Sequence, residues 1–100
     1  MELKLVNRGD VGEVLLIGRL DASTAPAADK ILSTLPERFN EIILNLSQMD
    51  YTASAGLRVI LKLQKAMEHK GGSLKIKGAK KMVLEVFEMT GFASFLDFID

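Results

Sequence analysis

The alternation of apolar and polar positions near the N-terminus predicts two strands. Leu3 and Leu5 alternate with polar residues, and the turn-forming residues 7–10 separate them from the apolar run VGEVLLIGRL. Such a pattern is typical of an antiparallel hairpin. Gly18 inside the second strand predicts a bulge or the close approach of another element.

A first helix is expected in the stretch DASTAPAADKILSTLP. Ser23 or Thr24 can cap its N-terminus, Pro26 suits its first turn, and the helix should end near Pro36. Its core-facing residues are expected to be Ile31, Leu32 and Leu35. The chain then crosses to the nearly continuous apolar run IILNL, which predicts a strand covered on both faces.

The middle of the chain, EIILNLSQMDYTASAGLRVILKLQKAMEHK, is the stretch around which we expect the fold to be organised. It predicts a buried strand over residues 41–46, a polar loop over 47–53 and a long helix that begins at Ser54 and ends at Gly71 and Gly72. A loop that leads into a helix presents free N–H groups and the positive end of the helix dipole at one point. Ser54 lies at that point.

The two faces of this helix follow from an advance of about 100° per residue. The face expected toward the core carries Gly56, Val59, Ile60, Leu63, Ala66 and Met67. The opposite face carries Ser54, Arg58, Lys65 and Glu68, together with the large apolar side chains of Leu57 and Leu61. These two leucines are out of place on a solvated face, so they predict an exposed apolar stripe that binds a partner.

The C-terminal part predicts a strand, a helix and an aromatic tail. SLKIKG alternates lysine with isoleucine, which suits a strand at a sheet edge. A helical period runs from Ala79 to Met89 through Met82, Val83 and Val86, and FASFLDFI should pack as a last strand or turn. The order of elements predicts an α/β fold, with one mixed sheet and helices packed against it, in a single domain over residues 1–100.

Composition narrows the class of partner. The 100 residues, 48% of them apolar, are enough for one compact core. Thirteen basic and thirteen acidic side chains cancel, which argues against nucleic acid or an anionic membrane as the partner. Cysteine is absent, and no apolar run reaches the roughly 20 residues of a membrane span. We therefore expect a cytoplasmic protein.

Catalytic and metal-binding patterns do not stand out in the sequence. The one histidine, His69, falls in the last turn of a helix, where the dipole favours a positive imidazole. Without cysteine or a second histidine, a metal site would need carboxylates alone, and these show no ligand spacing. Glycine-rich phosphate loops are also missing. The sequence favours a protein that is not an enzyme and has neither cofactor nor metal.

Ser54 has two interpretations. Serine is a preferred helix cap. At a helix N-terminus a serine is also a good phosphate acceptor, because free N–H groups and the dipole stabilise the phosphate. The stripe of Leu57 and Leu61 favours the second interpretation, since a phosphate of about −1.5 to −2 charge at the rim of an apolar docking face would block a partner.

Three blocks of this sequence resemble the STAS domain, in the branch of bacterial anti-sigma factor antagonists. They are GRLDASTAPAADKIL, ILNLSQMDYTASAGLRVILKLQKAMEHKGGSLKI and VLEVFEMTGF, and they cover almost the whole chain. The resemblance implies a four- or five-stranded sheet flanked by helices and a protein-binding switch. A serine kinase, either the anti-sigma factor itself or a companion, phosphorylates the antagonist. The unphosphorylated form binds the anti-sigma factor and so releases sigma factor, and a phosphatase resets the switch.

Position by position, the resemblance places the phosphoacceptor at Ser54, with Thr52 as a second acceptor. Asp21 matches the aspartate of the family's Leu-Asp loop, which is expected beside the phosphorylation loop. The implied partner footprint consists of Asp21, Ser23, Thr52, Ser54, Leu57, Arg58 and Leu61. The family's acidic residue before the acceptor is replaced by Ala53, and its second serine by Ala55.

These two replacements motivate an alternative, a STAS subunit that docks on a larger stress-signalling or lipid-transport complex without being phosphorylated. Under either interpretation the expected partners are proteins, and the chain itself is expected to be a monomer or a weak dimer.

Overall fold

A computed structural model describes residues 1–99 of the chain. Its elements, in chain order, are β1 (Glu2–Arg8), β2 (Val11–Leu20), α1 (Ala25–Leu32), the 3-10 helix η1 (Leu35–Glu37), β3 (Glu41–Asn45), β4 (Met49–Thr52), α2 (Ser54–His69), β5 (Ser73–Lys77), α3 (Lys81–Met89), the 3-10 helix η2 (Phe92–Phe95) and β6 (Asp97–Phe98).

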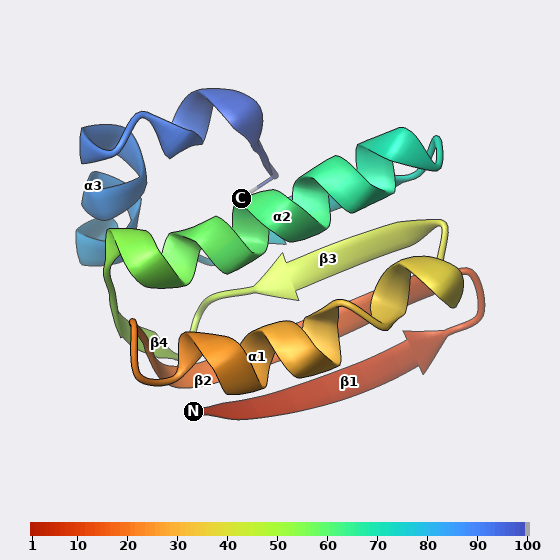
Figure 1. Cartoon of the computed structure of the whole chain (residues 1–100), viewed down its shortest axis with the longest axis horizontal. Coiled ribbons are helices and arrows are strands. Elements are labelled where there is room, and N and C mark those ends of the chain that lie inside the picture. The colour runs from red at the N-terminus through yellow and green to blue at the C-terminus, as the bar shows by residue number, and fades with distance from the viewer. Residues whose placement is uncertain (100) are drawn as a thin grey trace.

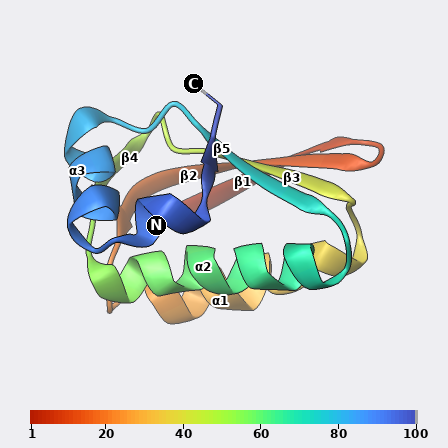
Figure 2. The ribbon, with the colours of Figure 1, turned by 90° about the horizontal axis from the view of Figure 1, so that it is seen from above.

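The strands form one mixed sheet with helices packed against it, as predicted. Their order is β1-β2-β3-β5-β6, and β4 pairs with β2 off this path. β1 and β2 form the predicted antiparallel hairpin, and all other pairs are parallel. α1 and α2 lie side by side under one face of the sheet, whereas α3 lies beside β4 at one end of it (Figures 1 and 2).

The sheet has six strands rather than the expected four or five. The additional strand β4 lies within residues 47–53, which the sequence indicated to be a loop. Only four residues long, β4 pairs with the end of β2, thirty residues earlier in the chain. Because so short a segment shows no clear hydrophobic period, its strand conformation depends on this long-range pairing.

Gly18 marks the point at which β2 changes partner. The predicted bulge is confirmed, because the register shifts between Gly18 and Arg19 and Gly18 has a φ of 99°. Residues 11–15 of β2 pair with β3, whereas its last three residues, Gly18 to Leu20, pair with β4. The bulge therefore directs the end of β2 toward the start of α2.

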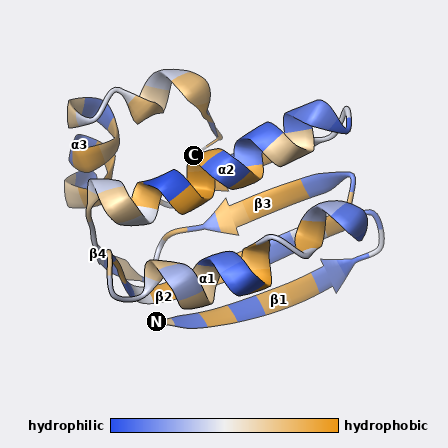
Figure 3. Cartoon of the chain, viewed as in Figure 1, coloured by the Kyte–Doolittle hydropathy of each residue, from blue (hydrophilic) through white to orange (hydrophobic). Residues whose placement is uncertain are grey.

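The core lies between the sheet and the helices α1 and α2. Alternate residues of β3 and β5 are buried against it. Figure 3 shows a similar alternation of apolar and polar residues along the edge strand β1. The apolar strand residues buried there are Val14, Leu16, Leu20, Ile42, Leu44, Met49, Leu74 and Ile76. From α2, the predicted core residues Gly56, Val59, Ile60, Leu63 and Met67 are buried, whereas Ala66 is exposed.

Three other apolar side chains of the helices are exposed, and one of them, Ile31, was expected to face the core. Ile31 is 49% exposed, Met82 55% and Met89 85%. In the last turn of α1, Leu32 is buried and Ile31 is not. In α3, the buried residues are Val83 and Phe87, which lie four residues apart. α3 packs against β4 and η2 at the end of the sheet, so it has a narrower buried stripe than its apolar residues suggested.

The aromatic tail forms η2 and β6, which confirms the expected last strand or turn. Phe98 of β6 contacts Phe87 of α3 edge to face, with ring centroids 5.3 Å apart. β6 also pairs with Lys75 and Ile76, so β5 lies between two strands instead of at the predicted sheet edge.

Glu13 lies on the sheet face opposite the helices, with only 7% of the residue exposed. Its carboxylate lies 3.1 Å from Arg8 Nη1 and 3.2 Å from Lys77 Nζ, and it accepts a 3.3 Å hydrogen bond from Asn45. Burial raises the pKa of Glu13, but the hydrogen bonds and positive charges of these neighbours outweigh it, so the pKa lies below the ordinary value.

Candidate functional site

Ser54 is the first residue of α2, and its side chain is exposed. The helix cap is Ala53, which has extended backbone dihedrals and no side-chain cap. The interpretation of Ser54 as the cap is therefore wrong by one position. Ser54 therefore occupies the first helical position, N1, whose side chain does not cap the helix. Its hydroxyl is left available at the positive end of the helix dipole.

Hydrogen bonds to one carbonyl group fix the start of α2. The carbonyl oxygen of Leu20, at the end of β2, accepts from the N–H of Ala53 at 3.2 Å and from the hydroxyl of Thr52 at 2.9 Å. Gly56 lies against the same peptide group, since a Cβ there would come within 2.7 Å of the Leu20 carbonyl carbon. The first turn of α2 is thus held directly against the strand end that precedes Asp21.

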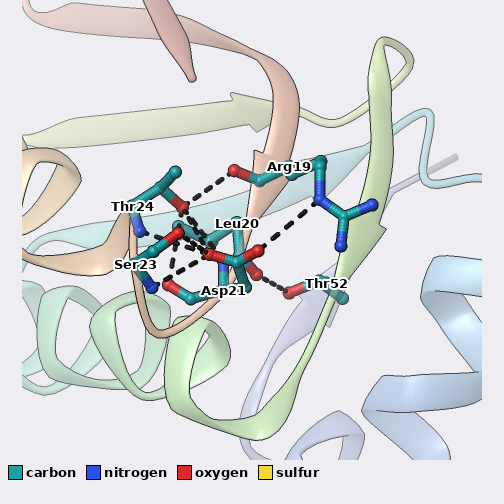
Figure 4. A network of polar contacts seen from close by, with 6 residues as sticks. All are labelled: Arg19, Leu20, Asp21, Ser23, Thr24 and Thr52. Atoms are coloured by element: carbon teal, nitrogen blue, oxygen red, sulfur yellow. Dashed lines mark hydrogen bonds and ion pairs between the residues drawn. The ribbon is translucent and has the colours of Figure 1, made fainter.

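Asp21 organises the loop between β2 and α1 (Figure 4). Its Oδ1 accepts hydrogen bonds from the hydroxyl of Ser23 at 2.7 Å, from the N–H of Ser23 at 3.0 Å and from the N–H of Thr24 at 3.2 Å. In return, the Thr24 hydroxyl accepts from the Asp21 N–H and donates to the Arg19 carbonyl oxygen at 2.8 Å. The loop is therefore a closed network and presents Ser23 at the surface.

The charge on Asp21 is stabilised by this network. The Ser23 hydroxyl is the main cause that lowers the pKa of Asp21 below its ordinary value, and the two backbone N–H groups and Arg19 act in the same direction. Arg19 Nε lies 3.5 Å from Asp21 Oδ2. The residue after Leu20, whose carbonyl group holds the start of α2, is thus a fixed anionic carboxylate.

Two predicted footprint residues do not reach the surface. Thr52 is only 2% exposed, and its hydroxyl is bonded to Leu20, so it serves neither as a second acceptor nor as a partner contact. Leu57 is fully buried, so the prediction of an exposed stripe of Leu57 and Leu61 is wrong. α2 contacts β5, α1 and η2, so it is packed on more sides than its apolar period indicated.

The remaining predicted residues belong either to α2 or to the loop that follows Leu20, the residue to which the start of α2 is bonded. Ser23, Ser54 and Arg58 are exposed, and Asp21 and Leu61 are half-buried. We call the set of Asp21, Ser23, Ser54 and Arg58 the Ser54 surface. Leu61 lies two turns along α2 from Ser54, toward η2.

Sequence reasoning missed Arg19 and Tyr51 at the edge of the Ser54 surface. The Arg19 guanidinium carbon lies 4.2 Å from the centroid of the Tyr51 ring, and Tyr51 is 37% exposed. The two residues meet because β2 and β4 pair, and no local pattern predicted that pairing. Arginine and tyrosine are the residue types that contribute most to binding energy at protein interfaces.

The one histidine of the chain lies far from the exposed hydroxyl of Ser54. His69 lies at the opposite end of α2, about 22 Å away at 1.5 Å per residue. Among residues 1–99, no cluster of three or more candidate metal ligands occurs. In the same part of the chain, no helix is long and apolar enough to cross a membrane.

Comparison with known proteins places the chain in a family. Residues 2–100 match the STAS domain. The anti-sigma-B factor antagonist of Bacillus subtilis is 29% identical over 91 residues, which are 91% of this chain and 83% of that protein. BtrV of Bordetella bronchiseptica is 40% identical over 76 residues, 76% of this chain but only 60% of BtrV.

Solved structures give the same fold. The anti-sigma factor antagonist SpoIIAA in its unphosphorylated form is 19% identical, with a TM-score of 0.82 over 99% of this chain and 89% of that one. Its phosphorylated form has a TM-score of 0.76 at 18% identity, over 99% of this chain and 92% of that one. The predicted STAS fold is therefore confirmed, and the chain belongs to the STAS domain family, in its branch of bacterial anti-sigma factor antagonists.

Proposed function

We propose that this chain binds a serine-kinase anti-sigma factor through the Ser54 surface, and that phosphorylation of Ser54 ends the binding and a phosphatase restores it. The observation that supports this most directly is the exposed serine at the first position of α2, beside the ordered Asp21 loop. In this scheme the unphosphorylated form sequesters the anti-sigma factor and thereby releases sigma factor.

The start of α2 suits a phosphoserine. The N–H groups of Ser54 and Ala55 lie at positions that have no intrahelical acceptor, and the dipole there stabilises a negative charge by about 0.3–2 kcal/mol. Arg58 is exposed one turn later and can approach a phosphate from the same side of the helix. Phosphorylation therefore need not distort the fold.

The effect of the phosphate on a partner rests on charge and bulk. With Leu57 buried, no continuous apolar stripe runs beside Ser54, so loss of apolar docking is not the reason. Instead, a phosphate of about −1.5 to −2 charge would join the Asp21 carboxylate on one small surface. A partner that has accommodated Asp21 and an uncharged serine would then face repulsion, an unpaired charge and a steric clash.

The test uses two variants of Ser54 and the cognate kinase. Ser54→Ala should bind constitutively, and Ser54→Asp should lose binding. A complete switch requires about 5.5 kcal/mol, or roughly a 10⁴-fold change in affinity. Calorimetric titration measures both affinities, and circular dichroism checks that both variants fold.

Ser33→Asp is the matched control, because Ser33 is an exposed serine at the far end of α1. It should bind as the parent does. Equal affinities for Ser54→Ala and Ser54→Asp would refute the proposed switch.

A second candidate function is that of an unphosphorylated STAS subunit in a larger complex. Ala53 and Ala55, which flank Ser54, favour it, because a kinase that recognises an acidic residue before the serine would find none at that position. Mass spectrometry of the protein purified from its own cells distinguishes the candidates. Phosphate on Ser54 under any growth condition supports the switch, and its absence under all of them supports the scaffold.

A further inference from the structure

A hollow of about 310 Å³ lies between α2 and η2, on the other side of α2 from α1. Leu61, Gln64, Lys65 and Glu68 of α2 line it together with Phe95 of η2. Phe95 is 64% exposed, so a large aromatic ring stands at the rim of the hollow instead of filling it. We call this region the η2 hollow.

We infer that the η2 hollow is a self-association site at which a second copy of this chain docks. An interface with two-fold symmetry uses the same patch on both copies, so the patch must carry both a protrusion and a recess. The η2 hollow carries both, because exposed Phe95 lies at the edge of a recess whose floor includes half-buried Leu61. Each copy can place its Phe95 ring in the hollow of the other.

The charges on the rim are also self-complementary. Lys65 and Glu68 are both exposed, have opposite signs and lie three residues apart on α2. When two α2 helices meet antiparallel about a two-fold axis that passes between Lys65 and Glu68, Lys65 of each copy faces Glu68 of the other. Neither residue is engaged in an ion pair within residues 1–99. The formal net charge of zero adds no long-range repulsion between copies.

The expected complex is a weak dimer, since the recess is small and its rim polar. This inference does not depend on Ser54 phosphorylation, and none of its test variants alters the Ser54 surface. In the dimer Leu61 is covered, so it is no longer accessible to a partner protein.

Sedimentation equilibrium at about 0.15 M salt, from about 10 μM to about 1 mM protein, covers the range of weak complexes. The mass of the parent chain should rise toward that of a dimer as concentration increases. Phe95→Asp should keep the chain monomeric throughout. Ile31→Asp is the matched control, because Ile31 is a 49% exposed apolar residue on α1, outside the hollow, and this variant should associate like the parent.

A charge exchange between copies tests the symmetry. Lys65→Glu alone and Glu68→Lys alone should each associate at least tenfold more weakly, because like charges then meet across the axis. An equimolar mixture of the two variants should regain association, since both pairs become attractive again, and no effect within one chain can produce this rescue. A parent chain that stays monomeric at about 1 mM, or a dimer insensitive to Phe95→Asp and to both charge reversals, would overturn the inference.

Discussion

Gly56, in the first turn of α2, lies against the carbonyl group of Leu20 at the end of β2. A Cβ at position 56 would come within 2.7 Å of the Leu20 carbonyl carbon, and this backbone atom cannot move aside as a side chain could. The closeness of the two residues brings Ser54 beside the Asp21 loop. The absence of a side chain at position 56 is therefore a requirement of the site's geometry.

Gly56→Ala should accordingly destabilise the fold, although alanine is the better helix former. We expect a loss of about 1–3 kcal/mol in the free energy of unfolding, as for other overpacked positions. Urea denaturation measures it. Ala66→Ser, at an exposed position of the same helix, should stay within about 0.5 kcal/mol of the parent. A Gly56→Ala protein as stable as the parent would contradict the close packing.

Leu57 and Leu61 should separate into a core residue and a surface residue. Leu57→Ala removes a fully buried side chain and should cost about 2–5 kcal/mol of unfolding free energy. Leu61→Ala, at a half-buried position one turn later, should cost less than half as much. Thermal and urea denaturation of the two variants provide the comparison. If Leu57→Ala retained full stability, the leucine would belong to the surface after all.

Glu13 should make the fold sensitive to acid. Its pKa in the folded chain lies below the ordinary value of 4.5, so its contribution to stability is fully present above that value and is lost as pH falls through the folded pKa. Glu13→Gln should lower the free energy of unfolding by about 1–3 kcal/mol at pH 7 and should reduce its decline between pH 5 and pH 3.

Urea titrations at a series of pH values measure this dependence. Glu85→Gln, at an exposed position on α3, is the control that removes the same charge without the buried partners. If the parent and Glu13→Gln lost stability in parallel as pH falls, the carboxylate would not be the acid-sensitive group.

Features of the structure that depend on neighbouring residues were predicted from the sequence, whereas features that depend on contacts between distant segments were not. The hairpin, the start of α2 and the position of Ser54 depend on local patterns, and all three were predicted. β4, the pair of Arg19 and Tyr51 and the burial of Leu57 depend on segments far apart in the chain. Leu57 in particular is fully buried although it lies beyond the arc that a helix packed only on a sheet would bury, and α2 has further contacts with α1 and η2.

Asp21 offers a test that separates the shape of the loop from its charge. Asp21→Asn keeps the Oδ1 acceptor for Ser23 and Thr24 but removes the negative charge, whereas Asp21→Ala removes both. Amide hydrogen exchange at Ser23 and Thr24 should therefore remain slow in the asparagine variant and become at least tenfold faster in the alanine variant.

Affinity for the cognate anti-sigma factor should then fall in both variants, and further in Asp21→Ala, because the carboxylate itself belongs to the proposed contact. Ser33→Asp again serves as the control outside the Ser54 surface. If Asp21→Asn bound as tightly as the parent, Asp21 would act only by shaping the loop. The repulsion between its carboxylate and a phosphate on Ser54 would then not explain the switch, and steric exclusion by the phosphate would be left as its cause.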